Sequence, residues 1–521
     1  MYAKIRSGVL QGIEARDVFV ETVVAFGFPA FTIVGLPDAA IRESRDRVRM
    51  AIRNAGFSFP DKRVTVNLSP ADIRKEGAHL DLPIALSILK ASGYLDGNVD
   101  GMAFFGELAL DGRVTGISGA LPLLLDLPEH GIRKALIPEQ NRAEAGLVKD
   151  VEVYCAGTLQ EVVEFLCGKR SLQHIGWQEY VPVLPDHLPD FGTVSGQEGA
   201  KRALQIAAAG MHNVLMTGPP GSGKTMLARC VPSIMPPMSY EESREVSRIY
   251  SACGLLDAEQ PLIRTRPFRS PDHTISPQAM IGGGRRIRPG EVSLAHLGVL
   301  FLDELPEFSG RTLEALRKPV EDEVSVISRL SGSVTLPAKF LLIGAMNPCP
   351  CGFAGWDPAG IPGSLETNGE SGFLHRVCTC TPSAVARYRR RLSGPFLDRF
   401  DIFLFVSPPG LEEIRRGGGT SSADLFKGVC RARAMQNERF GDGALRFNSQ
   451  IPPEELKKYC PLDKDTERLL EMAYLRNGMS MRAYNRVIRT ARTIADLEGR
   501  ERIRLEDAAE AISYRKQEES W

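Results

Sequence analysis

The sequence has no excess of either charge, no long apolar run and no apolar signal core. Its 64 Lys and Arg residues balance 64 Asp and Glu residues, so any contact with nucleic acid must come from a local basic cluster. No stretch of 18 apolar residues occurs, and Met1 to Arg6 lack the apolar core of a signal peptide. We therefore expect a cytoplasmic protein that does not cross a membrane.

The ten cysteines lack the pattern of a disulfide framework, which fits a reducing compartment. Four of them form two C-x-C pairs separated by 26 residues, and these are Cys349, Cys351, Cys378 and Cys380. Four thiols suit the tetrahedral sulfur set of structural Zn²⁺, although each pair is spaced more tightly than the usual C-x₂₋₄-C. A bound ion would hold together the two ends of the intervening loop. Four unconnected thiols, or disulfides, are the alternatives.

A phosphate-binding loop is the clearest motif that is present. The segment 218–225 satisfies G-x-x-x-x-G-K-[ST], directly after an apolar strand-like run and directly before a helical pattern. Glycines let the backbone bend so that successive N–H groups face a phosphate, while Lys224 supplies a charge and Thr225 a hydroxyl for Mg²⁺. We therefore expect ATP to bind here. The expected site comprises Gly218, Pro219, Pro220, Gly221, Ser222, Gly223, Lys224 and Thr225.

An apolar strand that ends in two acids, 299–304, follows this loop. Asp303 can hold Mg²⁺ together with Thr225, and Glu304 can take a proton from the water that attacks the γ-phosphate. The next apolar run ends at Asn347, whose neutral amide is suited to positioning that water. The pattern indicates catalysis of ATP hydrolysis as well as ATP binding.

The periodicity of the chain predicts three folded parts. Residues 1–168 alternate β-like runs (64–68, 102–105) with helical runs (81–89), which indicates one α/β domain. The proline-containing segment 169–190 is typical of a linker. An α/β core at 191–408 follows, and after a glycine-rich joint the residues 423–521 show helical spacing, with Ser480 as a candidate N-cap.

The chain resembles the YifB/ComM family of magnesium-chelatase-like AAA+ ATPases. Three segments of the predicted core carry the resemblance, and these are 265–271, 301–308 and 346–352. Three segments of the front domain are similar to the proteolytic domain of Lon, and these are 75–81, 106–114 and 137–141. It implies a Lon-like N-terminal domain, an AAA+ core and a C-terminal helical lid. Lon's serine would fall at His79 and its lysine at about Leu121, so we expect the front domain to be proteolytically inactive.

The resemblance also assigns roles to individual residues. Asn347 falls at sensor 1, and Arg482 falls at sensor 2. Arg399 falls at the arginine finger, which would reach the γ-phosphate bound by a neighbouring subunit. A local ion pair with Asp398 or Asp401 is the alternative for Arg399.

The resemblance further implies a ring of six subunits that hydrolyses ATP with Mg²⁺ and, as in ComM members, drives DNA branch migration during natural transformation. Branched or single-stranded DNA would then be the partner. Phosphate contacts supply sequence-independent affinity in such motors, although single surface arginines are often only solvated. The basic candidates for a DNA path, some of them flanking a predicted hairpin at 324–338, are Arg285, Arg286, Arg288, Arg329 and Lys339.

Two departures from the family pattern and two other functions are left open. Asp272 precedes His273 where family members usually carry a histidine pair, and a long glycine-rich stretch, 356–373, separates the cysteine pairs.

A magnesium-chelatase motor subunit, which inserts a metal into a porphyrin, would use the same ATPase core. The chain has no D-x-S-x-S metal-adhesion motif, but in chelatases that motif belongs to a partner subunit. A nucleotide-gated chaperone or scaffold is the non-catalytic alternative.

Overall fold

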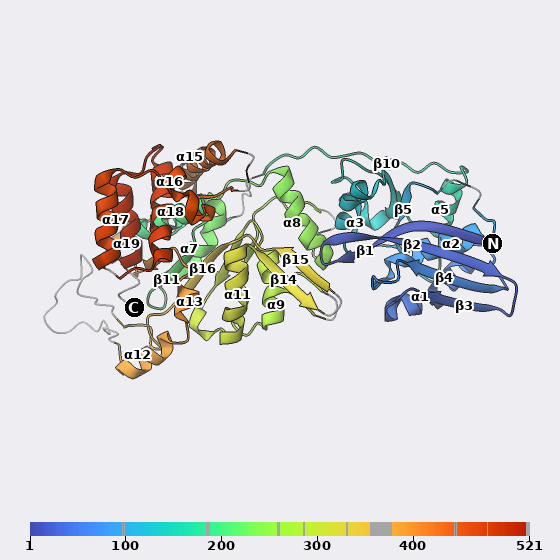
Figure 1. Cartoon of the computed structure of the whole chain (residues 1–521), viewed down its shortest axis with the longest axis horizontal. Helices are drawn as coiled ribbons and strands as arrows, with labels where there is room; N and C mark the ends of the chain where they lie inside the picture. Colours follow the sequence, from blue (N-terminus) through green and yellow to red (C-terminus); the bar gives the residue numbers. More distant parts are fainter. Residues whose placement is uncertain are drawn as a thin grey trace.

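The computed structural model describes residues 1–516 apart from 96, 98, 184–187, 258–260, 285, 286, 330, 331, 355–377, 442, 444 and 477. The molecule is elongated and has three parts in a row: an N-terminal α/β part, a core with a parallel sheet, and a group of C-terminal helices (Figure 1). Within the described part of the chain, no helix combines the length and the apolar character needed to cross a membrane.

The N-terminal part is built on a mixed eight-stranded sheet of order β10-β9-β8-β5-β1-β2-β4-β3. Buried and exposed residues alternate along β2, because successive side chains of a strand point to opposite faces of the sheet. The strands are β1 (Tyr2–Gln11), β2 (Glu14–Ala25), β3 (Ala30–Val34), β4 (Arg63–Ser69), β5 (Met102–Phe104), β8 (Lys134–Pro138), β9 (Glu152–Ala156) and β10 (His174–Ile175), and β6 (Glu107–Leu108) and β7 (Val114–Thr115) form a separate small hairpin. The helices are α1 (Ala39–Asn54), α2 (Asp81–Ala91), α3 (Ala120–Asp126), α4 (Arg142–Ala145) and α5 (Leu159–Leu166).

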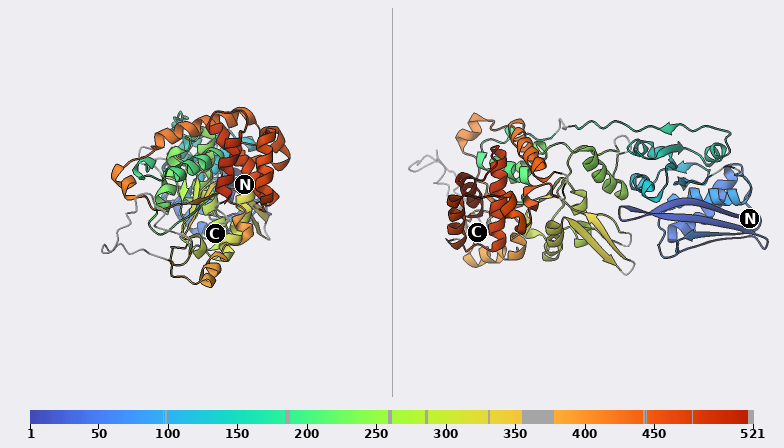
Figure 2. Two further views of the ribbon diagram at one scale, coloured as in Figure 1. Left: turned by 90° about the vertical axis from the view of Figure 1, so that its left-hand side faces the viewer. Right: turned by 45° about the horizontal axis from the view of Figure 1, so that its top comes forward.

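The strands predicted at 64–68 and 102–105 and the helix predicted at 81–89 are confirmed as β4, β5 and α2. The predicted linker contributes β10, which pairs antiparallel with β9 before the chain returns toward the core (Figure 2). At the two positions where a protease dyad was considered, His79 Nε2 lies 3.0 Å from the Gly8 carbonyl oxygen, and Leu121 is buried in α3.

The core contains a five-stranded parallel sheet of order β12-β13-β16-β11-β17. Its strands are β11 (Val214–Thr217), β12 (Phe268–Arg269), β13 (Val299–Leu302), β16 (Leu341–Met346) and β17 (Ile402–Phe405). Its helices are α6 (Glu198–Gly210), α7 (Lys224–Cys230), α8 (Tyr240–Cys253), α9 (Pro277–Ile281), α10 (Glu291–Leu294), α11 (Gly310–Asp322), α12 (Pro382–Arg389) and α13 (Gly394–Leu397). The carboxyl ends of β13, β16 and β11 therefore lie side by side at one edge.

The predicted hairpin is confirmed as β14 (Val324–Arg329) and β15 (Gly332–Pro337). Its apolar face joins a small buried cluster that also contains Ile13, from the β1–β2 turn, and Ile249 of α8. Nearby, Arg248 on α8 forms an ion pair of 2.5 Å with Asp126 of the N-terminal part. The hairpin and α8 thus attach the N-terminal part to the core.

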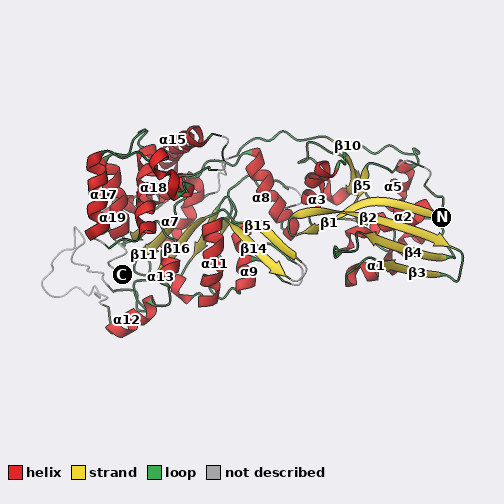
Figure 3. Cartoon of the chain, viewed as in Figure 1, coloured by secondary structure: helices red, strands yellow, loops and turns green. Residues whose placement is uncertain are grey.

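The described residues after β17 form helices and loops (Figure 3). The helices are α14 (Leu411–Arg416), α15 (Ser422–Phe440), α16 (Leu456–Tyr459), α17 (Lys464–Arg476), α18 (Met481–Leu497) and α19 (Leu505–Lys516). Ser480 caps α18 by accepting a hydrogen bond from the Ala483 amide, as predicted. Apolar residues of α15, α18 and α19 share one buried cluster with α6 and the parallel sheet, so these helices are packed on the core.

Candidate nucleotide-binding and catalytic site

The glycine-rich loop lies between the end of β11 and the start of α7, as predicted. Gly221 and Gly223 have φ angles of +77° and +90°, which residues with a side chain rarely adopt. A Cβ atom on Gly218 would lie 2.1 Å from the Val406 carbonyl oxygen. Glycine is therefore required at all three positions, for backbone conformation at two and for close packing at the third.

Lys224 is 8% exposed and turns back into the loop. Its ammonium group donates hydrogen bonds to the carbonyl oxygens of Gly218 (2.8 Å) and Pro219 (2.9 Å), and it lies 3.4 Å from Asn347 Oδ1. Burial lowers the pKa of Lys224 to about 8, against the opposing attraction of Asp303. A bound phosphate would supply the missing negative charge and stabilise the protonated form.

Thr225 and Asp303 are in direct contact across neighbouring elements. The Thr225 hydroxyl donates a hydrogen bond of 2.8 Å to Asp303 Oδ2. A hydroxyl and a carboxylate oxygen are ligands that Mg²⁺ prefers, and that ion usually retains several of its waters. The donor set therefore fits Mg²⁺, which Thr225 and Asp303 would hold beside the phosphates.

Glu304 follows Asp303 in a left-handed backbone conformation, with φ of +49° and ψ of +44°. This conformation is uncommon for a residue with a side chain. The Glu304 amide donates to Asp303 Oδ1 (2.9 Å), while 62% of the Glu304 side chain is exposed. The carboxylate is therefore accessible to water at the edge of the site, where a general base must act.

His273 lies beside Glu304, with 3.9 Å between His273 Nδ1 and Glu304 Oε2. The sequence left the role of the Asp272–His273 pair open. The Asp272 carboxylate accepts hydrogen bonds from the amide (2.9 Å) and hydroxyl (2.6 Å) of Thr274, so it orders its own turn. Sequence reasoning did not place His273 in this site; the available signal was its position just after β12, the strand that pairs with β13.

Asn347 directly follows β16, which pairs with both β13 and β11. The structure therefore brings together five of the predicted site residues at one sheet edge. These residues are Lys224, Thr225, Asp303, Glu304 and Asn347.

Arg399 and Arg482 lie together at a different place, on the carboxylate of Glu321 near the end of α11. Arg399 Nη2 is 2.6 Å from Glu321 Oε2, and Arg482 pairs with the other oxygen of the same carboxylate. Among the described residues, Arg399 forms no ion pair with Asp398 or Asp401, which was the alternative to a finger role.

Helix α18 is fixed to the segment that carries Arg399. Arg486 of α18 donates to the carbonyl oxygen of Arg399 (3.0 Å) and forms an ion pair of 2.6 Å with Asp401. Burial raises the pKa of Asp401, but the charge of Arg486, the nearby His212 and hydrogen bonds from Arg486 and the Asn213 amide together hold that pKa below its ordinary value. A movement of α18 would therefore move Arg399 and Arg482 together.

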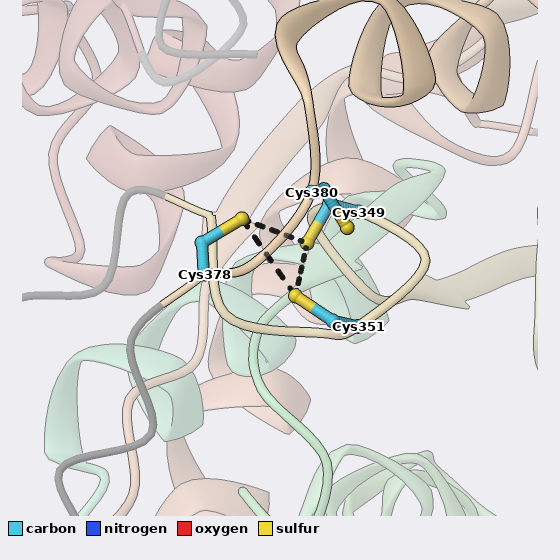
Figure 4. Close-up of side chains that lie close together, drawn as sticks. All are labelled: Cys349, Cys351, Cys378 and Cys380. Carbon is cyan, nitrogen blue, oxygen red and sulfur yellow. Dashed lines mark hydrogen bonds between the residues drawn. The ribbon is translucent and has the colours of Figure 1, made fainter.

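The four paired cysteines converge, although they come from both sides of the long loop (Figure 4). Their sulfur atoms all lie within 4.8 Å of one another, and Cys349 is fully buried. All four are free thiols. The cluster can therefore bind Zn²⁺. The glycine-rich stretch at 356–373 lies outside the described residues.

The candidate DNA contacts are only partly described. Arg285, Arg286 and the side chain of Arg329 lie outside the described residues. Arg288 is exposed and lines a cavity that also includes Gln11 and Arg42 of the N-terminal part. Lys339 forms an ion pair of 3.2 Å with Glu323 and is 20% exposed, so its charge is already neutralised within the chain.

A parallel sheet of this order, with a phosphate loop after β11 and an acidic pair after the nearby β13, defines the class of AAA-like P-loop ATPases. Three family models match: "Magnesium chelatase, subunit ChlI" at residues 190–414, "Subunit ChlI of Mg-chelatase" at 20–141, and "Magnesium chelatase, subunit ChlI C-terminal" at 419–515.

Similar proteins extend this match over the whole chain. An uncharacterized protein YifB of Salmonella typhimurium is 43% identical over 97% of this chain and 95% of its own. Competence protein ComM of Haemophilus influenzae is 41% identical over 98% of this chain and 97% of its own. The magnesium-chelatase 67 kDa subunit of Heliobacterium mobile is 31% identical, but over only 31% of this chain and 28% of its own. The chain belongs to the YifB/ComM family of magnesium-chelatase-like proteins, which implies an AAA ATPase.

Proposed function

We propose that this protein is an AAA+ motor that forms a ring of six subunits and hydrolyses ATP to move DNA strands in branch migration or helicase activity. Natural transformation or recombination would be the setting. The observation that carries the DNA assignment is the end-to-end similarity to competence protein ComM, whereas the similarity to the magnesium-chelatase 67 kDa subunit of Heliobacterium mobile spans less than a third of this chain.

The proposed hydrolytic step uses the residues at the edge of the parallel sheet. Lys224 binds the β- and γ-phosphates, Thr225 and Asp303 hold Mg²⁺, and the ion supplies neutralisation of phosphate charge. Glu304 takes the proton of the attacking water, which Asn347 helps to position. The support for these roles is the short contacts among Lys224, Thr225, Asp303 and Asn347 and the accessible carboxylate of Glu304.

The proposed ring rests on the position of the two arginines. Both are paired with Glu321 rather than with their own phosphate loop, and the buried Arg399 would have to leave this pair to reach a nucleotide on a neighbouring subunit. In the assembled ring, Arg399 would act as the finger and Arg482 as sensor 2. Exposed apolar side chains on the C-terminal helices could be buried against a neighbouring subunit, and they include Met472, Leu475 and Met481.

The proposed domain limits follow the sequence periodicity. Residues 1–168 form a Lon-like, proteolytically inactive domain, 169–190 a linker, 191–408 the AAA+ core and 423–521 the helical lid. Neither His79 nor Leu121 offers the hydroxyl or amine of a Ser–Lys dyad, which supports an inactive front domain.

We expect forked or four-way DNA to stimulate ATP hydrolysis by the purified protein several-fold, because a nucleic-acid motor couples ATP turnover to movement along the DNA that it binds. Porphyrin and unfolded protein should have no such effect. The measurement is steady-state phosphate release with each additive, and Lys224→Ala is the control for a contaminating ATPase. Stimulation by porphyrin or by protein, with none by DNA, would support one of the other functions and contradict this one.

A further inference from the structure

We propose that Cys349, Cys351, Cys378 and Cys380 bind one structural Zn²⁺, and that the metal-bound turn supports the phosphate-binding loop. Loss of the metal would then weaken ATP binding as well as loosen the turn. The first half of this proposal stands on the sulfur geometry alone. The second half rests on the ATP site proposed above.

The sulfur positions fit a tetrahedral ion. With Zn–S bonds of about 2.3 Å, the sulfur atoms of a tetrahedral site lie about 3.8 Å apart. The Cys349–Cys378 and Cys351–Cys378 sulfur distances are 3.8 Å and 3.6 Å, and the Cys349–Cys351 distance is 3.3 Å (Figure 4). A disulfide would need about 2.05 Å. Small adjustments would therefore place all four sulfurs around one ion.

The turn that begins at Cys349 and continues past Cys351 is built to hold thiolates. The Ala354 amide donates a hydrogen bond of 3.3 Å to Cys349 Sγ. The Gly352 amide donates to the Cys349 carbonyl oxygen (3.0 Å), which closes the turn, and Gly352 takes a φ of +89° that favours glycine. Amide donors aimed at a metal-bound sulfur are typical supports of such sites.

The same turn touches the phosphate loop. A Cβ atom on Gly352 would lie 2.5 Å from Cδ of Pro220, so the Gly352 backbone packs against the Pro220 ring more closely than a residue with a side chain allows. Asn347, two residues before Cys349, lies 3.4 Å from the ammonium group of Lys224. The first cysteine pair is thus connected to the ATP site both through Pro220 and through Asn347.

The second cysteine pair continues directly into α12. Thr381, next to Cys380, is the N-cap of this helix and accepts a hydrogen bond from the Ala384 amide. Helix α12 leads through α13 to the segment that carries Arg399. A single ion would therefore fix the Asn347 segment and the start of α12 relative to each other. Binding is not a redox step, because each thiol that coordinates Zn²⁺ releases its proton to solvent.

The first measurement is elemental analysis of the full-length protein purified without chelators or a metal-binding tag. We expect about one zinc per chain and loss of that zinc in Cys378→Ser. Cys430→Ser, which removes a thiol on α15 outside the cluster, should retain it. Substantially less than one zinc, with all four thiols reactive, would overturn the site whatever the protein's activity.

The second measurement is the affinity for a fluorescent ATP analogue. Cys378→Ser, which removes a ligand without changing the turn that touches Pro220, should bind ATP roughly tenfold more weakly, because that turn would no longer be held against the phosphate loop. Zinc-free protein should be weakened similarly and should recover when Zn²⁺ is added back. Unchanged affinity in both would overturn the coupling while leaving the metal site intact. If the unaltered, zinc-loaded protein bound no ATP, the proposed ATP site itself would fail.

Discussion

Replacing Glu304 with Gln is expected to reduce ATP turnover by at least about two orders of magnitude and to leave ATP binding unchanged. A positioned general base contributes about 10²- to 10⁴-fold, and glutamine keeps the shape of the side chain but cannot accept the proton. Because 62% of the Glu304 side chain is exposed, the change should not unfold the protein. Steady-state phosphate release and the affinity for a fluorescent ATP analogue measure the two effects separately.

A nearby glutamate provides the matched control. Glu307 lies three residues further on and forms an ion pair of 2.7 Å with Arg391. Glu307→Gln should therefore turn over ATP at nearly the parental rate, whereas Lys224→Ala should lose ATP binding. Parental turnover by Glu304→Gln would show that another group is the base.

Replacing Arg399 with Ala is expected to abolish ATP hydrolysis in a way that a second, differently inactive chain can repair. Arginine fingers contribute about 10³- to 10⁵-fold. Arg399 and Arg482 are paired with Glu321 and not with their own phosphate loop, which supports the proposal that Arg399 acts on the neighbouring subunit's nucleotide. Arg399→Ala keeps a working phosphate loop and Lys224→Ala keeps a working finger. In an equal, random mixture about a quarter of the interfaces would place the intact phosphate loop of one chain against the intact Arg399 of the other.

ATPase activity of the mixture, with co-assembly shown by two affinity tags, is the measurement. Arg468→Ala, which removes a largely exposed arginine on α17, is the control and should be active by itself. Mixed rings that regain no activity would contradict a finger acting on the neighbouring subunit.

The sequence was most informative where a function depends on contiguous residues. A phosphate loop needs its glycines, lysine and threonine in one short run, so the strand, loop and helix around Lys224 could be predicted. Asp303 and Asn347 could be predicted because polar residues at the ends of neighbouring parallel strands meet at one edge. The convergence of the two cysteine pairs was a hypothesis that the sequence raised beside unconnected thiols, and the structure confirms that the four sulfur atoms lie close together.

Contacts between distant parts of the chain could not be predicted in the same way. The shared partner of Arg399 and Arg482 is Glu321, and nothing in the local pattern of α11 distinguishes it from other exposed carboxylates. The packing of α15 and α18 on α6 depends on which apolar faces meet. The periodicity of a sequence shows which side of a helix is apolar, but it does not show which other helix packs against that side. The position of His273 beside Glu304 depends likewise on the pairing of β12 with β13.

The most direct test of a DNA motor is displacement of a labelled strand from a four-way junction or fork. The unaltered protein with ATP and Mg²⁺ should separate the strands. Glu304→Gln, which is expected to bind ATP and to assemble like the unaltered protein, should bind the same DNA and separate none of it. Strand separation by Glu304→Gln at the parental rate, or none by an unaltered protein that hydrolyses ATP, would contradict the proposal that ATP hydrolysis drives movement of DNA.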